Sequence, residues 1–240
     1  MNMRKPLTLI TWMLIAATLL SVAFAISPLP AVSADDKQEA TQLVEKAQFA
    51  LESFMADSNM DAFHDLLKQA KGVFIAPQLL KGAFVIGVSG GSGVFFAWDD
   101  RMGRWNGPAF YTTGGASFGL QIGGQASEVI LLAMTERGVS SFRSSSFKLG
   151  GDAGVAAGPV GIGVSAATAN LSADILSFSR SKGLYGGISL DGAVVATRGD
   201  WNSAYYDKVV EPGDILTIQT VTNPQAAGLI QAVTKATGKK

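Results

Sequence analysis

In three segments of this chain, large apolar side chains alternate with glycine or serine. The segments begin near Ser117, Val160 and Gly187. A two-residue period is typical of a β-strand with one buried face, so the chain is predicted to fold around a sheet. A glycine inside a strand costs about 0.5–1 kcal/mol relative to alanine, and something must offset that cost. Close packing of a neighbouring element or barrel curvature is the expected reason, and a shallow groove for an acyl chain is the alternative.

The run Phe178–Val195 contains two strand-like pieces on either side of the glycine-rich bend Gly183–Gly187. Beyond the bend, Ile188, Leu190 and Val194 share one parity, which predicts a second half-buried strand. The density of glycine in the bend indicates a positive φ, a bulge or the close approach of another group.

Elsewhere the sequence predicts helices first and strands afterwards. Apolar residues in Asp35–Met55 recur at three- and four-residue steps, which predicts a helix, and a second helix is expected over Asn59–Ala70 with Ser58 or Asn59 as its cap. The further expected elements are a strand at Gly72–Ala76 that stops at Pro77, a hairpin of Ala83–Val88 and Val94–Trp98, a central strand at Val129–Met134, helical turns at Asn202–Lys208 and Ala226–Ala236, and a late strand at Ile215–Val221. This order predicts an α+β domain, with N-terminal helices packed on a glycine-rich, mostly antiparallel, barrel-like β-sheet.

The N-terminal residues have the pattern of an export signal. Arg4 and Lys5 precede the uncharged, mostly apolar stretch Leu7–Ile26, and small residues lead up to Ala34. We therefore expect residues 1–34 to be a signal peptide cleaved after Ala34, or alternatively after Ala25, and residues 35–240 to form a single domain. An uncleaved membrane anchor is the other interpretation, because about 20 apolar residues can cross a bilayer.

Composition excludes several classes of function. The 19 basic and 19 acidic residues balance, and a protein that binds nucleic acid usually has a basic excess. The chain has no cysteine, which excludes disulfides, thiolate metal sites and a cysteine nucleophile. With one histidine in addition, we predict neither a metal site nor a cofactor.

Two segments, Gly87–Gly91 and Gly115–Gly119, match the GxSxG pattern of serine hydrolases. A nucleophilic serine needs a base, and the only histidine, His64, lies in the predicted helical region before both serines. His64 is therefore expected at the surface or in helix packing. We predict no catalytic residues and no enzymatic activity.

Cationic and aromatic residues occur together in two places, and these are the candidate binding residues. An arginine or lysine beside a tryptophan or tyrosine suits the interface between a lipid headgroup and an acyl chain, although ordinary surface loops show the same pattern. The candidates are Trp98, Arg101, Arg104 and Trp105 in the first place and Arg180, Lys182 and Tyr185 in the second.

Seven segments in order resemble the lipid-binding SYLF domain family. They are AKGVFIAP from Ala70, KGAFVIGVSGGSGV from Lys81, WNGPAFY from Trp105, SFGLQIGG from Ser117, GPVGIGVSA from Gly158, the run from Phe178 and AYYD from Ala204. The resemblance implies a phospholipid-binding module without known catalytic residues. Eukaryotic members bind phosphoinositides, some bind actin through attached regions, and bacterial members are typically exported single-domain proteins. The basic N-terminal helix attributed to eukaryotic members is acidic here, so phosphoinositide specificity and actin binding are not carried over.

Leader and resemblance together predict an exported, non-enzymatic phospholipid-binding protein of the bacterial cell envelope. It would act in the periplasm or envelope, peripheral to the membrane, with a phospholipid or membrane surface as partner and no nucleic acid. The alternative is a structural or protein-interaction module of the envelope, with an envelope protein as partner and no lipid ligand.

Overall fold

The computed structural model describes residues 34–83, 86–118, 123–161, 165, 172–181, 184–186 and 190–239. Helices and 3-10 turns in the described residues are α2 (Ala34–Met55), η1 (Ser58–Met60), α3 (Asp61–Gln69), α4 (Glu136–Ser141), α5 (Gly199–Tyr206), α6 (Pro212–Leu216), η3 (Pro224–Ala226) and α7 (Ala227–Thr237). The strands are β1 (Gly72–Ala83), β2 (Ile86–Asp99), β3 (Arg104–Phe118), β4 (Gly123–Ala133), β5 (Ser146–Lys148), β6 (Val155–Ala157), β7 (Ile175–Ser181), β8 (Leu184–Gly186) and β9 (Val194–Thr197).

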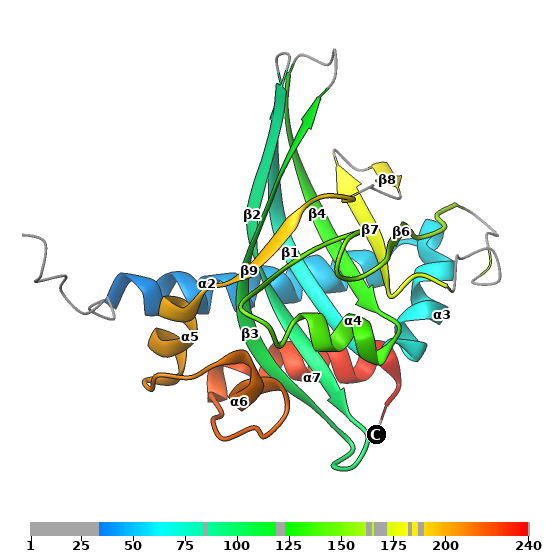
Figure 1. The fold of residues 1–240 in the computed structure, drawn as a ribbon. Helices are drawn as coiled ribbons and strands as arrows, with labels where there is room; N and C mark the ends of the chain where they lie inside the picture. The colour runs from blue at the N-terminus through cyan, green and yellow to red at the C-terminus, as the bar shows by residue number, and fades with distance from the viewer. Residues whose placement is uncertain are drawn as a thin grey trace, which may run out of the picture. The chain divides into compact units, whose positions relative to one another are not determined.

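The nine described strands form one curled sheet in the order β5-β9-β3-β2-β1-β4-β7-β6, with β8 paired to β7. Only the β6–β7 pair of these strands is parallel. Helix α2 crosses the long strands, with α7 alongside it and α5 near one of its ends (Figure 1), and α2 contacts β1, β2, α5 and α7. The predicted α+β fold with a mostly antiparallel, barrel-like sheet is confirmed.

The two N-terminal helices follow the apolar periodicity of the sequence. The predicted stripe of α2 is buried from Ala40 to Phe54. The second predicted helix is divided into η1 and α3, and its cap is neither Ser58 nor Asn59. Asp57 is the cap, because its carboxylate accepts a hydrogen bond from the Asn59 amide at 2.7 Å. A carboxylate is as good an N-cap as a hydroxyl or amide, so composition alone does not choose between these neighbours.

The predicted hairpin around Ser89–Gly93 is wrong, because β2 runs through these residues without a turn. Their glycines are needed for close packing between strands. A Cβ added at Gly91 would overlap the Gln78 carbonyl, and one added at Gly93 would overlap the Phe74 ring and lie 2.7 Å from the Ile75 carbonyl oxygen. In this part of the sheet, close packing between strands explains the glycines.

The expected end of a strand at Pro77 is also wrong, since β1 continues to Ala83. Pro77 lies where the register of β1 shifts, between Ile75 and Gln78 against β2 and between Ala76 and Leu79 against β4. A proline has no amide hydrogen for the ladder, and a bulge is one of the few places in a sheet that tolerates it.

The late strand predicted at Ile215–Val221 is a helix over its first two residues. Pro212 begins α6, and Glu211 and Asp214 form a reciprocal capping box around it. Proline at the first helical position and this box favour a helix more strongly than the apolar run favours a strand. The helical turns predicted at Asn202–Lys208 and Ala226–Ala236 are confirmed as α5 and α7.

The three alternating segments have different outcomes. Ser117 and Phe118 end β3, Gly123 begins β4, and residues 119–122 lie outside the described residues. Val160 is described and lies in no strand, and residues 162–164 lie outside. In the run Phe178–Val195, β7 pairs antiparallel with β8, but β8 is Leu184–Gly186 and so lies inside the predicted bend. The strand expected after the bend begins only at Val194, because Asp191 and Gly192 form a turn.

A cluster of aromatic side chains fills the space between the sheet and the segment after α4. The Phe142 ring is stacked on Phe95 with centroids 3.8 Å apart. Tyr111 and Phe147 meet the Phe142 ring edge-on at 5.4 and 4.8 Å. The central strand predicted at Val129–Met134 is confirmed over Val129–Ala133, the buried last part of β4, and Met134 follows the strand.

No helix among the described residues combines the length and the apolar character that a bilayer span needs. The predicted leader, residues 1–34, lies outside the described residues except for Ala34, which begins α2. Export and cleavage therefore stay predictions.

Asp174 should make the fold less stable at acidic pH than at neutral pH. The Thr135 hydroxyl donates to its carboxylate at 2.6 Å and the Gly154 amide at 2.9 Å, and with Arg137 nearby these bonds hold the pKa of Asp174 below its usual value despite burial. The stabilisation is complete above the pKa of the unfolded chain and is lost as the pH falls through the folded-state pKa. We expect Asp174→Asn to lower the free energy of unfolding by about 1.5–3 kcal/mol near neutral pH. At about pH 3, below the ordinary pKa of about 3.9 of an aspartate in the unfolded chain, the difference from wild type should be smaller.

Urea unfolding at both pH values measures this. Asp207→Asn is the control, because its ion pair with Lys37 is exposed and should contribute little at either pH. An equal loss for Asp174→Asn at both pH values would contradict the assignment.

Candidate functional site

An open groove of about 770 Å³ lies between helix α2 and the strands β1, β4 and β7. Its floor comes from the strands and its wall from the exposed face of the helix. The lining residues are Lys46, Phe49, Ala50 and Ser53 of α2, Pro77 and Gln78 of β1, Ala126, Ser127 and Glu128 of β4, and Arg180 of β7. Among the sequence-predicted binding residues that the structure describes, Arg180 lines this groove.

Arg180 is held firmly at the groove. The register of β4 and β7 places it directly opposite Glu128. Its Nε donates to Glu128 Oε2 at 2.6 Å and its Nη2 to Oε1 at 2.7 Å, so the two side chains form a bidentate pair, and Nη1 donates to the Ser53 hydroxyl. The side chains of Arg180 and Glu128 are 26% and 27% exposed. The guanidinium is therefore oriented by its partners, and the side chain is partly exposed at the groove.

The other side chains give the groove both cationic and apolar character. Lys46 and Arg180 are the cations of the lining and Glu128 is the anion. Phe49 is 69% exposed, although its aromatic ring would suit a core. Ser53 and Gln78 add groups that donate and accept hydrogen bonds. Such a lining can accommodate a molecule with an anionic head and an apolar body.

Sequence reasoning missed Lys46, Phe49, Ser53 and Glu128 as site residues. One signal could have identified Phe49, because it is a large aromatic residue outside the apolar stripe of the predicted helix. Glu128 gave no comparable signal. It is 52 residues from Arg180 in the sequence, and only strand pairing brings the two together.

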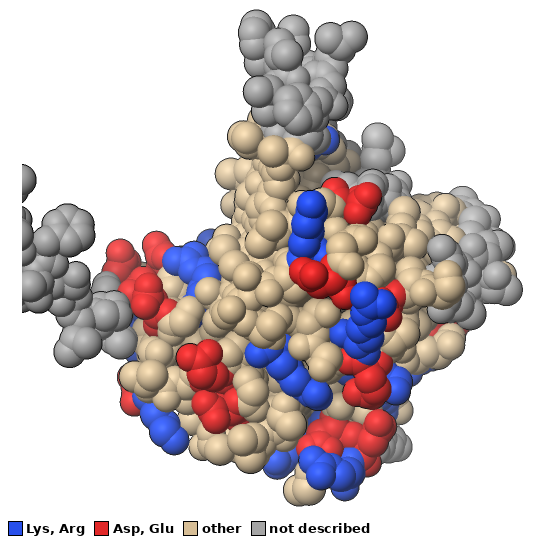
Figure 2. Space-filling model, viewed as in Figure 1, with Lys and Arg blue, Asp and Glu red and all other residues tan. Residues whose placement is uncertain are grey.

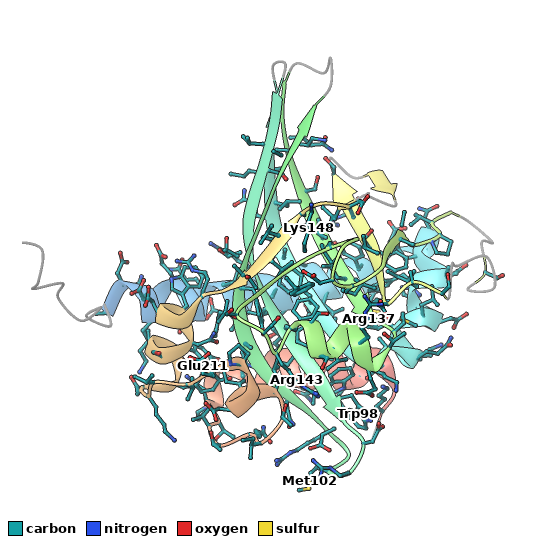
Figure 3. All side chains as sticks on the ribbon, in the orientation of Figure 1. Trp98, Met102, Arg137, Arg143, Lys148 and Glu211 are labelled. Atoms are coloured by element: carbon teal, nitrogen blue, oxygen red, sulfur yellow. The ribbon has the colours of Figure 1, made fainter. Side chains whose placement is uncertain are left out.

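The other predicted cluster lies at the opposite end of the sheet. Figure 3 shows Trp98 and Met102 at the β2–β3 turn, at the end of these strands remote from the projecting ends of β1 to β4. Arg101 is 84% exposed there and Arg104 is also exposed. Trp105 is buried against Trp98, with ring centroids 5.4 Å apart. The seven candidates therefore do not form one site.

Lys239 is the cation that contacts the two tryptophans. Its Nζ lies 5.1 Å from the Trp98 ring centroid and 5.2 Å from that of Trp105, and it donates to the Ala70 carbonyl oxygen at 2.6 Å. Burial lowers the pKa of Lys239. These contacts fasten the end of the described chain to the β2–β3 turn, so this cluster has a structural role.

Lys182 lies outside the described residues, and only the backbone of Tyr185, in β8, is described. The binding role of all seven candidates stays a prediction. Ser89, in the first GxSxG match, donates to the Gly115 carbonyl oxygen at 3.4 Å, and His64 Nε2 lies 3.2 Å from the Phe54 carbonyl oxygen, in helix packing as expected. Within the described residues, no three acidic or histidine side chains gather as metal ligands.

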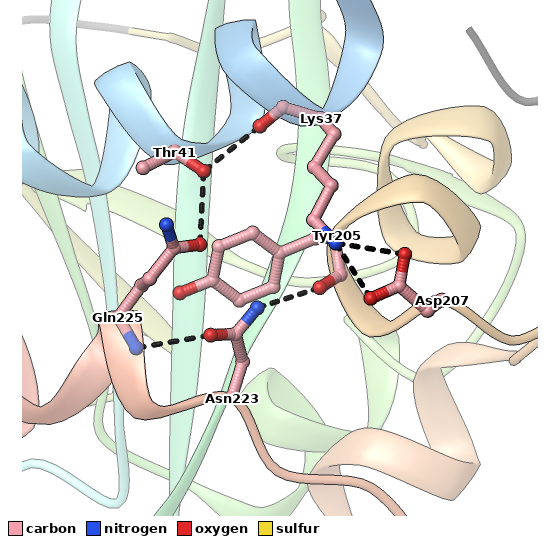
Figure 4. Close-up of polar contacts among 6 residues, drawn as sticks. All are labelled: Lys37, Thr41, Tyr205, Asp207, Asn223 and Gln225. Atoms are coloured by element: carbon pink, nitrogen blue, oxygen red, sulfur yellow. Dashed lines mark hydrogen bonds and ion pairs between the residues drawn. The ribbon is translucent and has the colours of Figure 1, made fainter. Parts of the chain in front are cut away.

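A smaller, polar hollow of about 250 Å³ lies where α2 meets the C-terminal segments. Figure 4 shows its hydrogen bonds: Lys37 pairs with Asp207, the Thr41 hydroxyl donates to Gln225 at 3.1 Å, and the Asn223 amide donates to the Tyr205 carbonyl oxygen at 2.6 Å. Because these side chains bond mainly to one another, they join the first described helix to the C-terminal segments and do not form an open binding site.

The sequence matches a protein-family model and several known proteins. A family model described as "Ysc84: Las17-binding protein actin regulator" matches residues 114–236. The chain is 35% identical over 166 residues to an SH3 domain-containing protein of Schizosaccharomyces pombe, covering 68% of this chain and 38% of that protein. It is 30% identical over 178 residues to the human SH3 domain-containing YSC84-like protein 1, covering 72% and 51%. It is 29% identical over 210 residues to protein YSC84 of Saccharomyces cerevisiae, covering 85% and 44%.

The chain thus spans between 38% and 51% of the length of these three relatives. Their names refer to SH3 domains or to YSC84, and none of the three is the name of an enzyme. The family match includes β9, α5 and most of α7 as well as the end of β3 and all of β4. The chain belongs to the Ysc84 family, which is the family of SYLF domains that its sequence motifs resemble.

Proposed function

We propose that this protein is a non-enzymatic phospholipid-binding domain, exported to the envelope of a bacterium, where it works peripherally to the membrane. The observation that carries the proposal is the groove beside α2, in which Arg180 and Lys46 lie next to the exposed ring of Phe49. Cations suit a phosphate headgroup and the aromatic ring suits the first part of an acyl chain. The leader-like residues 1–34 support export.

Liposome flotation of the protein tests this function. Vesicles of phosphatidylcholine, and of phosphatidylcholine with phosphatidylglycerol, should carry the protein upward at low salt. The anionic vesicles should carry more of it, because the cations of the groove attract the phosphatidylglycerol headgroup. If neither vesicle carries the protein at low salt, lipid binding is wrong.

Glu128 should limit the affinity for anionic lipid. In the free protein its carboxylate occupies two donors of Arg180, and a phosphate must compete for them. Replacing Glu128 with glutamine keeps the size of the side chain and removes that charge. One charge near an anionic membrane contributes about 1 kcal/mol, so we expect Glu128→Gln to bind phosphatidylglycerol vesicles about fivefold more tightly and Arg180→Gln to bind them more weakly by a similar factor.

Flotation across a series of phosphatidylglycerol contents measures both changes, and circular dichroism monitors the fold. Asp207→Asn is the matched control, because it also removes one carboxylate from an ion pair, and that pair lies at the other hollow. If the wild-type protein, Glu128→Gln and Arg180→Gln give identical binding curves, the groove is not the headgroup site, even if all three bind vesicles.

A second candidate function is a protein-interaction module. It is favoured by the description of the matching family as Las17-binding and by the name of a relative, LAS seventeen-binding protein 3 of Saccharomyces cerevisiae. For this chain the partner would be an envelope protein. Crosslinking in intact cells should then capture one defined protein, and native mass spectrometry of the purified protein should show no lipid. Copurified phospholipid together with no crosslinked partner would rule out this candidate.

A further inference from the structure

The long strands β1 to β4 extend beyond the rest of the sheet (Figure 1). The last residue of β3 that pairs with β9 is Gly114, and the first residue of β4 that pairs with β7 is Glu128. Beyond these positions the four strands have only one another as partners. We call this part the sheet tip and define it as Leu80–Ala83 of β1, Ile86–Gly90 of β2, Gly115–Phe118 of β3 and Gly123–Ser127 of β4.

The sheet tip has almost no charge. Lys81 is its one charged residue. In Figure 2 the described atoms of the projecting end are almost all tan, whereas blue and red side chains are spread over the body below it. Leu80 and Val88 are 55% and 62% exposed, although both are aliphatic. Exposed strands of a soluble protein normally carry several charged side chains. The sheet tip has one, so its surface is poorly suited to contact with water.

Two glycines of the sheet tip differ from those in the body of the sheet. A Cβ added at Gly82 or Gly124 would have no heavy atom within 4 Å, whereas one added at Gly93 would overlap the neighbouring strand. Close packing therefore does not explain Gly82 and Gly124. An exposed aliphatic side chain such as that of Leu80 or Val88 gains free energy when it leaves water for an apolar surrounding.

Much of the backbone of the tip is hydrogen-bonded within the sheet. The inner strands β1 and β2 pair on both sides as far as Ala83 and Gly87. The outer edges of β3 and β4 have no partner strand at the described part of the tip, and there the Ser89 hydroxyl donates to the Gly115 carbonyl oxygen and the Ser181 hydroxyl to the Ala126 carbonyl oxygen. These bonds reduce the number of unpaired polar groups that lipid would surround, where such groups are costly.

We propose that the sheet tip inserts into the hydrocarbon of one membrane leaflet when the protein binds phospholipid. Five residues of strand extend about 17 Å, and half of a bilayer's hydrocarbon core is about 15 Å thick. Lys148 lies near the base of the projecting strands (Figure 3), where a lysine would meet the headgroups. The inference rests on the proposed lipid-binding function, and it adds the part of the protein that enters the bilayer.

Because the chain has no cysteine, a single introduced cysteine can carry an environment-sensitive fluorophore. We would label Val88→Cys in the sheet tip. The matched control is Val209→Cys, since Val209 is also an exposed valine, 83% exposed, and lies between α5 and α6. Both labelled proteins are mixed with equimolar phosphatidylcholine–phosphatidylglycerol vesicles that carry a quencher on the acyl chain. Insertion predicts a blue shift and quenching for the label at 88 and neither for the label at 209.

A charge at the same place supplies a second measurement. Val88→Asp should weaken vesicle binding at least about tenfold, because a carboxylate is disfavoured in hydrocarbon, and Val209→Asp should leave binding unchanged. Both valines are exposed, so both variants should fold, and circular dichroism checks this.

The outcomes separate the tip from the function on which it rests. If the protein floats with vesicles while the label at 88 stays in water, insertion is wrong and lipid binding stands. If the label shifts without vesicles, and more so at higher protein concentration, a second copy covers the tip and insertion is wrong. If the wild-type protein does not float, the proposed function fails and insertion fails with it.

Discussion

Replacing Phe142 with alanine is expected to lower the free energy of unfolding by about 3–5 kcal/mol. Phe142 follows α4 and its ring is fully buried. It is stacked on Phe95 and meets Tyr111 edge-on, so it contacts rings from two strands of the sheet. Aromatic pairs in these geometries add about 0.5–1.5 kcal/mol beyond the area that they bury. Alanine would leave a cavity that these rings cannot close without moving the sheet.

Equilibrium urea unfolding, followed by circular dichroism, measures the loss. Phe49→Ala is the matched control, since it removes the same atoms from a ring that is mostly in water. We expect Phe49→Ala to change stability by less than about 0.5 kcal/mol. If the two variants unfold at the same urea concentration, the aromatic cluster does not stabilise the fold as described.

Replacing Gly93 with valine should cost about 3 kcal/mol, the upper end of the usual cost of overpacking. Gly93 faces β1 inside the body of the sheet, where a Cβ would overlap the Phe74 ring and lie 2.7 Å from the Ile75 carbonyl oxygen. The ring is itself held between Tyr111 and Phe142, and the carbonyl belongs to a paired strand. Neither neighbour can move away without breaking other contacts.

Gly82→Val is the control, because a Cβ at Gly82 has no heavy atom within 4 Å and valine favours strands. Thermal unfolding of the two variants should therefore differ clearly, with Gly82→Val close to wild type. A similar loss of thermal stability in both would show that strand glycines matter here for backbone conformation and not for packing.

The helices could be predicted well from the sequence because their signal is local. The apolar stripe of α2 runs from Ala40 to Phe54, about four turns, and its buried residues follow the helical period. Strand boundaries depend on partners instead. Ser89–Gly93 has the composition of a turn, and only the neighbouring strand shows that its glycines lie inside β2. The segment Pro212–Asp214 is compatible with the approach to a strand as well as with the start of a helix, and the capping box of Glu211 and Asp214 stabilises the helix α6.

The candidate site could be predicted only in part for the same reason. Arg180 stood out beside an aromatic residue, but the sequence gave no indication that Glu128 would hold it. Trp98 and Trp105 are predicted to lie at the interface between a lipid headgroup and an acyl chain, whereas Trp105 is buried in the structure. Lys239, the last described residue, contacts both tryptophan rings. Partners brought together over such separations are decided by the fold and not by neighbouring residues.

Helices α2 and α7, the first and last described helices, pack against each other, and α7 also contacts α3 and β3. The apolar residues Leu229 and Val233 of α7 are buried in that interface and the core beside it. Part of the surface that buries the apolar stripe of α2 is therefore synthesised almost 200 residues after α2. A nascent chain of this protein cannot close its core before synthesis is nearly finished, since contacts between distant segments form late. Until then the apolar stripe of α2 lacks part of the surface that buries it in the folded protein.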